Sequence, residues 1–208
     1  NFIVKAQHSE GGWRYTPRQR GDTSVLGWQV MALQSAHAAG LFVPPQTLNK
    51  ASQYLDQAQT SNSLYGYEPD HNSPTHVMTA EALLCRFYLG YNQKSPGVEY
   101  GINYLVKDHM PLKPPKDHMP LKTPDMYYMY YGTQLMHHYG GQPWKTWNAQ
   151  MRDRLIASQE TTGHRAGSWT PIHNHDRKGG RIFTTAMAVC CLEVYYRHLP
   201  IFRELELE

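Results

Sequence analysis

The amino-acid sequence predicts an all-α fold made of αα-hairpin repeats that curve into part of a ring. A short pattern recurs about every 50 residues: an aliphatic residue, then Gln, then Gly-x-Trp or a variant of it. Between the copies, apolar residues recur with the period of helices, and no segment alternates as a strand would. Glycines that can end helices recur with the same spacing. These three observations indicate an array of like helical units.

Four copies of the pattern lie along the chain, the first in FIVKAQHSEGGW and the fourth in RLIASQETTGHRAGSW. The aliphatic position holds Ile3, Leu55, Leu105 and Leu155, and the Gln position holds Gln7, Gln59, His109 and Gln159. The Gly-x-Trp ending is complete at Trp13 and Trp169, is Gly66-Tyr67 in the second copy, and is missing from the third. A Gln amide at a helix end can bond to free carbonyls, Gly permits a turn, and an aromatic ring covers the junction. We therefore expect the motif to be a joint between helices.

Each unit is expected to contain two helices of different kinds. The first kind is amphipathic: in PPQTLNKASQYLDQAQ an apolar stripe is formed by Leu48, Ala51, Leu55 and Ala58, and WKTWNAQMRDRL has a similar stripe. The second kind is apolar nearly all round and has four examples, SVLGWQVMALQSAHAAG, THVMTAEALLCRFYLG, DMYYMYYGTQLMHHYGG and FTTAMAVCCLEVYYRHL. A helix that is apolar on every side must be covered on every side, so we expect apolar helices in an inner layer and amphipathic helices in an outer layer.

Capping residues mark the expected ends of the apolar helices. Three starts are expected at Asp22-Thr23, Ser73-Pro74 and Thr123-Pro124. Three ends are expected at Gly40, Gly90 and Gly140. Between the third and fourth units, KDHMPLKPPKDHMPLKTP contains KDHMPLK twice, and its prolines predict an extended connector without chemistry.

The composition limits the classes of function. With 20 basic and 17 acidic residues among 208, the net charge of +3 does not favour a nucleic-acid partner. Three cysteines make a disulfide framework unexpected and suit the cytoplasm, although the compartment stays undetermined. No apolar run is long enough for a membrane span, and no cofactor is indicated. We expect a single domain over residues 1–208 that is part of a longer protein.

The stretches FIVKAQHSEGGW and RLIASQETTGHRAGSW resemble the QW motif of the prenyltransferase and squalene-oxidase repeat family, which includes squalene–hopene cyclases and protein prenyltransferase β subunits. The resemblance covers all four units. It implies an α/α toroid, with inner and outer helix rings around an apolar central cavity. It also implies that, if the protein is an enzyme, it is of the terpenoid cyclase or prenyltransferase kind. The chain departs from the catalytic motifs of that family: in RQRGDTSV only Asp22 and Thr23 match the end of Asp-x-Asp-Asp-Thr, and no Asp-x-Cys zinc pair occurs.

Two carboxylates are candidate catalytic acids. Aligning GWQVM, TAEAL and GTQLM places Gln29, Glu81 and Gln134 at one height of successive apolar helices. If Glu81 is desolvated and points into a cavity, its pKa would be raised and it could donate a proton. The alternative is a ladder of hydrogen bonds between neighbouring helices. Asp22 is the second candidate, although a helix cap is its simpler interpretation.

An apolar ligand would contact residues of the apolar helices, and the candidates are Trp28, Gln29, Tyr127, Tyr128, Tyr131, Gln134 and His137. Their rings could line a pocket or stabilise a carbocation, and a packed core is the alternative. No metal site is predicted. The stretch HNHD offers His173, His175 and Asp176, but a solvated loop is the simpler interpretation.

Two functions are compatible with these residues. The first is a terpene cyclase- or prenyltransferase-like repeat domain that binds an isoprenoid or other apolar ligand in a central cavity, without the complete acid motif or zinc ligands of that family. The second is a non-catalytic helical-repeat scaffold that binds a protein partner or the remainder of its own chain. A dry apolar cavity would favour the first, and an apolar surface patch would favour the second.

Overall fold

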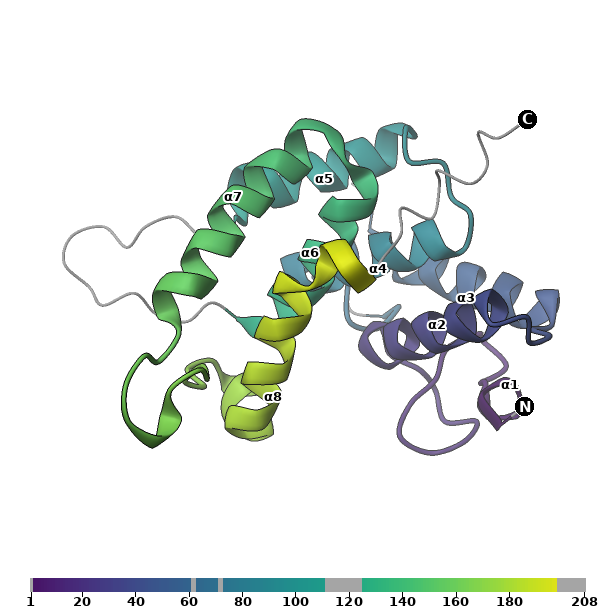
Figure 1. The fold of residues 1–208 in the computed structure, drawn as a ribbon. Helices are drawn as coiled ribbons and strands as arrows, with labels where there is room; N and C mark the ends of the chain where they lie inside the picture. The colour runs from purple at the N-terminus through teal and green to yellow at the C-terminus, as the bar shows by residue number, and fades with distance from the viewer. Residues whose placement is uncertain (1, 61–62, 71–72, 111–124, 198–208) are drawn as a thin grey trace. The chain divides into compact units, whose positions relative to one another are not determined.

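The computed structural model describes residues 2–60, 63–70, 73–110 and 125–197, and these ranges are all-helical (Figure 1). In the same ranges the β-type pairing is limited to the isolated bridges Trp13–Asp22 and Gln59–Tyr65. The predicted all-α class is therefore confirmed. No helix of the described part is long and apolar enough to cross a membrane.

The chain separates into two compact units, Asn1–Gly101 and Ile102–Glu208. Unit 1 contains α1 (Phe2–Ala6), α2 (Thr23–Ala38), α3 (Pro45–Ala58), α4 (His76–Tyr88) and the start of α5 (Pro96–Asp108). Unit 2 contains the rest of α5, α6 (Met126–Tyr139), α7 (Gly141–Ser158), the 3-10 turn η1 (Gly163–Arg165), α8 (Asn174–Leu192) and α9 (Val194–Arg197). The boundary falls within α5, and the single domain over residues 1–208 and the toroid stay predictions.

Unit 1 is built around α2, which packs against both α4 and α3. The amphipathic helix α3 buries Ala51, Leu55 and Ala58, whereas Lys50 and Gln53 are exposed. This is the stripe that the sequence predicts. Apolar helix α4 buries every residue from 78 to 87, which agrees with its apolar composition on all sides.

Unit 2 is built around α6, which packs against α7 and α8 (Figure 1). Gly132 of α6 allows a close approach, because a Cβ there would lie 2.6 Å from the ring of Trp147 on α7. The Trp147 indole also donates a hydrogen bond of 3.0 Å to the hydroxyl of Thr133. Helix α8 bends at Gly180, which has φ 75° and separates a short first segment from the main segment.

The helix ends follow the predicted capping residues with one correction. Asp22 caps α2, as predicted, by accepting the Val25 amide at 2.7 Å. Helix α4 is capped by Thr75 rather than Ser73, because the extended backbone of Thr75 aims its hydroxyl at the Met78 amide, 3.1 Å away. The prediction of glycine helix ends is confirmed, since φ is positive at Gly40, Gly90 and Gly140. Asp125 caps α6, whereas Thr123-Pro124 and most of the duplicated KDHMPLK segment lie outside the described residues.

Candidate functional site

The first copy of the motif closes the junction that follows α1. Gln7 Nε2 donates to the carbonyl of Gly11 at 2.9 Å and to that of Thr47, at the start of α3, at 3.0 Å. Trp13 is 2% exposed, and its indole donates to the Ile3 carbonyl at 2.8 Å. Gly11 has φ 101°, in the region that favours glycine. These bonds confirm that the Gln amide binds the turn backbone and that the aromatic ring covers the joint.

The fourth copy repeats, in unit 2, the bond from Gln to the glycine carbonyl and the bond from the indole to the helix. Gln159 Nε2 donates to the Gly167 carbonyl at 3.0 Å, and the Trp169 indole donates to the Leu155 carbonyl at 2.8 Å. Gly167 has φ 83°, and Trp169 is 2% exposed. Each residue of the first joint therefore has a counterpart here, although the two turns differ in length.

The second copy has the same turn. Its buried aromatic residue is Tyr65, whereas the sequence indicates Tyr67. The Thr60 amide donates to the Leu64 carbonyl at 2.7 Å, as the His8 amide donates to that of Gly12 at 2.9 Å. Ser63 takes the left-handed position with φ 57°. Tyr65, 3% exposed, thus occupies the place of Trp13. The expected ending at Gly66-Tyr67 is therefore wrong by two residues, because Ser63 replaces glycine at the turn.

Asp22 is fully buried and surrounded by donors. Its Oδ1 accepts the Val25 amide, and its Oδ2 accepts the Tyr67 hydroxyl at 3.0 Å and lies 3.5 Å from Arg14 Nη1. Burial, with the nearby Asp22 charge as a second cause, raises the pKa of Tyr67, so this phenol remains a hydrogen-bond donor. Both oxygens of Asp22 are thus engaged as hydrogen-bond acceptors, next to a guanidinium. The arrangement favours the cap interpretation of Asp22 over that of a proton donor.

Glu81 lies in the contact between α4 and α2, where it is fully buried. A Cβ added to Gly27 would lie 2.0 Å from Glu81 Oε1, so the carboxyl fills the space that a side chain at Gly27 would need. Burial, and then the charge of Glu81, raises the pKa of the Cys85 thiol one turn away. Elsewhere on α2, Trp28 is 37% exposed and Gln29 is half-buried. In unit 1, Glu81 thus lies in a contact between helices, whereas Trp28 and Gln29 lie on a partly exposed surface.

Most of the unit 2 candidates are packed. Tyr128 donates to the His109 carbonyl at 2.9 Å, and burial raises its pKa. Tyr131 is fully buried, and its ring lies edge-on to that of Tyr127, with centroids 5.1 Å apart. Gln134 Nε2 donates to a carbonyl of its own helix, that of Tyr130, at 3.2 Å. These contacts favour the core interpretation for Tyr128, Tyr131 and Gln134.

The last of these candidates, His137, is half-buried on α6. Its ring lies edge-on to that of Trp144 on α7, with centroids 5.0 Å apart, and near the ring of Tyr195 on α9 at 6.2 Å. Trp28 and Gln29 belong to unit 1, and the other five ligand candidates belong to unit 2.

The HNHD stretch forms the start of α8 and not a loop. His173 and His175 are exposed, whereas Asp176 is fully buried and its two carboxyl oxygens make no hydrogen bond of ordinary geometry. Burial is the main cause that raises the pKa of Asp176, and the charge of Asp125 adds to it. His173 and the amides of Met126 and His173 act in the opposite direction. Within the described ranges no three His, Cys, Asp or Glu side chains are grouped to hold a metal ion.

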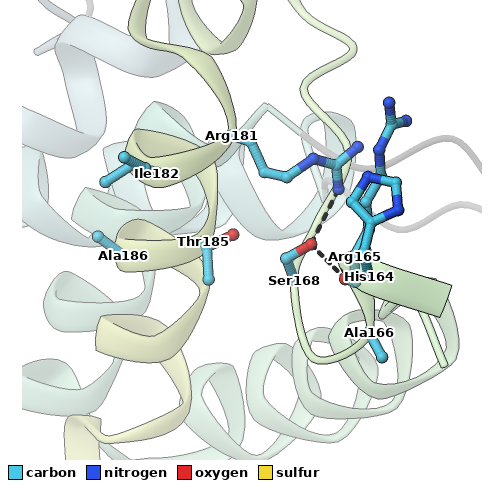
Figure 2. A pocket seen from close by; sticks show the side chains of 8 residues that line it. All are labelled: His164, Arg165, Ala166, Ser168, Arg181, Ile182, Thr185 and Ala186. Carbon is cyan, nitrogen blue, oxygen red and sulfur yellow. Dashed lines mark hydrogen bonds between the residues drawn. The ribbon is translucent and has the colours of Figure 1, made fainter. Parts of the chain in front are cut away.

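A groove that sequence reasoning missed runs along one side of α8. Its volume is about 590 Å³, and its lining is formed by His164, Arg165, Ala166, Ser168, Arg181, Ile182, Thr185 and Ala186 (Figure 2). Ile182 is 88% exposed, and Val189 is 37% exposed two turns further on. The predicted apolar helix starts at Phe183, and its residues Ala186 and Val189 are exposed, so the expectation that this helix is covered on every side is wrong for this side. The sequence pattern of α8 carries no signal for it, because apolar residues occur all round the helix.

The groove joins an apolar part to a basic part. In Figure 2, Arg181, His164 and Arg165 gather on the side of the η1 turn, and Ile182 and Ala186 lie on the opposite side. Arg181 donates to Ser168 Oγ at 3.0 Å and to Thr170 Oγ1 at 3.1 Å. The fourth copy of the motif thus supplies one wall, since Ser168 lies between its Gly and its Trp.

No protein-family model matches the chain, and no curated protein matches it with significant similarity.

Proposed function

We propose that this chain is a helical-repeat domain that binds an isoprenoid or another apolar ligand along the exposed side of α8. The groove beside Ile182 carries the proposal. A β-branched aliphatic side chain that is 88% exposed has no role in the core of its own unit. Together with Ala186 it forms an apolar wall in a concave site, and such sites are the usual places where apolar ligands bind.

The repeated joints support the wider part of the proposal, that the chain is an array of αα-hairpins of the toroid type. Three turns, one after each of α1, α3 and α7, share the same amide–carbonyl bond and a buried aromatic residue. In each unit two apolar helices pack together, α2 with α4 and α6 with α8. In a toroid of this kind the exposed side of α8 would face the central cavity.

The proposed activity is binding rather than cyclisation. Proton transfer to an olefin needs a carboxyl group that is held protonated and faces the substrate. Asp22 is engaged by an amide, a phenol and a guanidinium, and Glu81 packs against the backbone of α2. Neither lines the groove beside α8.

One observation supports the alternative of a protein-binding scaffold. Leu41 and Phe42, which follow α2 in unit 1, are 62% and 85% exposed. Adjacent exposed apolar side chains are typical of surfaces that contact another protein or another part of the same chain. In this alternative a protein segment, and not a small ligand, would cover Ile182.

The experiment is a titration of the intact chain with geraniol, followed by calorimetry, together with native mass spectrometry to identify any co-purified lipid. Ile182→Ser should weaken binding about ten-fold, because a buried Ile contributes roughly 1.5–3 kcal/mol. The matched control is Ile156→Ser, since Ile156 is 58% exposed on α7 and lies outside the groove. Absence of geraniol binding and of any co-purified lipid would contradict the proposal, and so would equal effects of the two variants.

A further inference from the structure

We propose that the ligand of this groove is an amphiphile whose anionic head group, a carboxylate or a phosphate ester, is bound by Arg181. This inference rests on the proposed function and adds to it the chemical class of the ligand. It follows from the positive charge at one side of the groove and from the way in which Arg181 is held.

Arg181 is oriented without being neutralised. Its two Nη atoms donate to the hydroxyls of Ser168 and Thr170, which fix the plane of the guanidinium but carry no charge. No carboxylate of the described residues lies within 4.0 Å of it. One acidic side chain is linked to it indirectly, because Glu160 Oε1 accepts the Thr170 hydroxyl at 2.5 Å. Arg181 is half-buried, so an anion that reaches it would complete an ion pair of reduced solvent screening.

Two further basic side chains line the same side of the groove. Arg165 and His164 belong to the η1 turn, are exposed, and stand beside Arg181 in Figure 2. A guanidinium fork matches the oxygens of a carboxylate or a phosphate in a bidentate geometry. The turn and the kinked start of the main α8 segment therefore place two Arg and one His on the same side of the groove.

The apolar wall decides between a free anion and an amphiphile. Ile182 and Ala186 lie along α8 beyond Arg181, so a ligand bound through its head at Arg181 would extend its tail over them (Figure 2). A wholly apolar ligand would cover Arg181 and remove water from a cation that pairs with no carboxylate of the described residues, which costs free energy. An inorganic anion would leave Ile182 exposed. In an amphiphile, the anionic head group would pair with Arg181 and the apolar tail would cover Ile182.

The test compares ligands that share one skeleton: geraniol, geranic acid and geranyl phosphate, with inorganic phosphate as the ligand that has no tail. Each is titrated into the intact chain at constant ionic strength and below the concentration at which the amphiphiles aggregate. We expect geranic acid and geranyl phosphate to bind at least about ten-fold more tightly than geraniol. We expect inorganic phosphate to bind at least about ten-fold more weakly than geranyl phosphate, because it lacks the tail.

Variants assign the head group to Arg181. Arg181→Gln should remove the advantage of the acid and the phosphate while leaving geraniol affinity within about two-fold, which also shows that the groove is intact. Arg177→Gln is the matched control, since Arg177 is exposed on α8 before the kink and does not line the groove. Should Arg181→Gln fail to fold, Arg165→Gln and the salt dependence of geranyl phosphate binding provide the same test, with a loss of about two- to five-fold expected for Arg165→Gln.

The outcomes separate the two proposals. Equal affinity for geraniol, geranic acid and geranyl phosphate would overturn the anionic head group and leave the proposed function standing. Inorganic phosphate binding as tightly as geranyl phosphate would show a free-anion site and overturn the amphiphile. Failure of all the geranyl ligands to bind would overturn the proposed function together with this inference.

Discussion

The environment of Asp176 opposes its negative charge. It is fully buried at the start of α8, and the charge of Asp125 is near it. Burial raises its pKa above 3.8, the usual value, and Asp125 adds to this, whereas His173 and the amides of Met126 and His173 oppose it. A raised native pKa means that the folded chain binds this proton more tightly than the unfolded chain does. The free energy of unfolding therefore falls as pH rises from about 3.8 through the native pKa.

Asp176→Asn removes this titration. As pH rises from about 4, we expect the unfolding free energy of the variant to gain on that of the parent until the pH has passed the native pKa of Asp176, measured by urea denaturation. Asp153→Asn is the control, because Asp153 is exposed on α7 and pairs with its neighbour Arg152. A difference between Asp176→Asn and the parent that does not change with pH would show that Asp176 is ionised equally easily in both states.

Gly27 and Glu81 form a second residue-scale test, this time of packing. Gly27→Ala places a Cβ 2.0 Å from Glu81 Oε1 and should cost about 1–3 kcal/mol of stability. In a Glu81→Ala background the carboxyl is gone, so Gly27→Ala should cost distinctly less. A double-mutant cycle by chemical denaturation measures this coupling. Additive effects would mean that the two residues do not share the space between α2 and α4.

At the scale of elements, the joint between helices is where sequence and structure agree most closely. Gln7 with Trp13 and Gln159 with Trp169 bind the backbone positions that a joint requires. The prediction of the second joint is wrong because Ser63, and not glycine, adopts positive φ there, and a sequence pattern based on glycine does not detect it. The predicted cap of α4 is wrong for a similar local reason. Both Ser73 and Thr75 are residue types that cap helices, and the extended backbone of Thr75 selects it.

Trp169→Phe tests the joint as an element. The change keeps an aromatic ring but leaves the Leu155 carbonyl, at the end of α7, without its indole donor. The unfolding free energy should fall by about 1–3 kcal/mol. Trp144→Phe is the matched control, because Trp144 is half-buried on α7 and contacts the rings of His137 and Tyr195. A loss for Trp144→Phe as large as that for Trp169→Phe would remove the special role of the joint.

At the scale of the whole molecule, the sequence predicts the helices and their types but not which surfaces remain open. Helix α8 has apolar residues on all sides, so its composition cannot tell that α6 covers one side and that Ile182 lies open on another. The groove also needs Arg181, which is placed by the bend at Gly180 and by hydroxyls from the turn before α8. Such a site depends on contacts between segments, and a periodic pattern within one segment does not predict those contacts.

The most direct measurement of the central claim is methyl NMR of the chain labelled at the δ1 methyl of isoleucine, during titration with geraniol. Our account predicts a saturable shift of the Ile182 methyl signal, while that of Ile156, also exposed but outside the groove, stays in place. No shift at Ile182, or equal shifts at Ile182 and Ile156, would contradict a ligand site along the exposed side of α8.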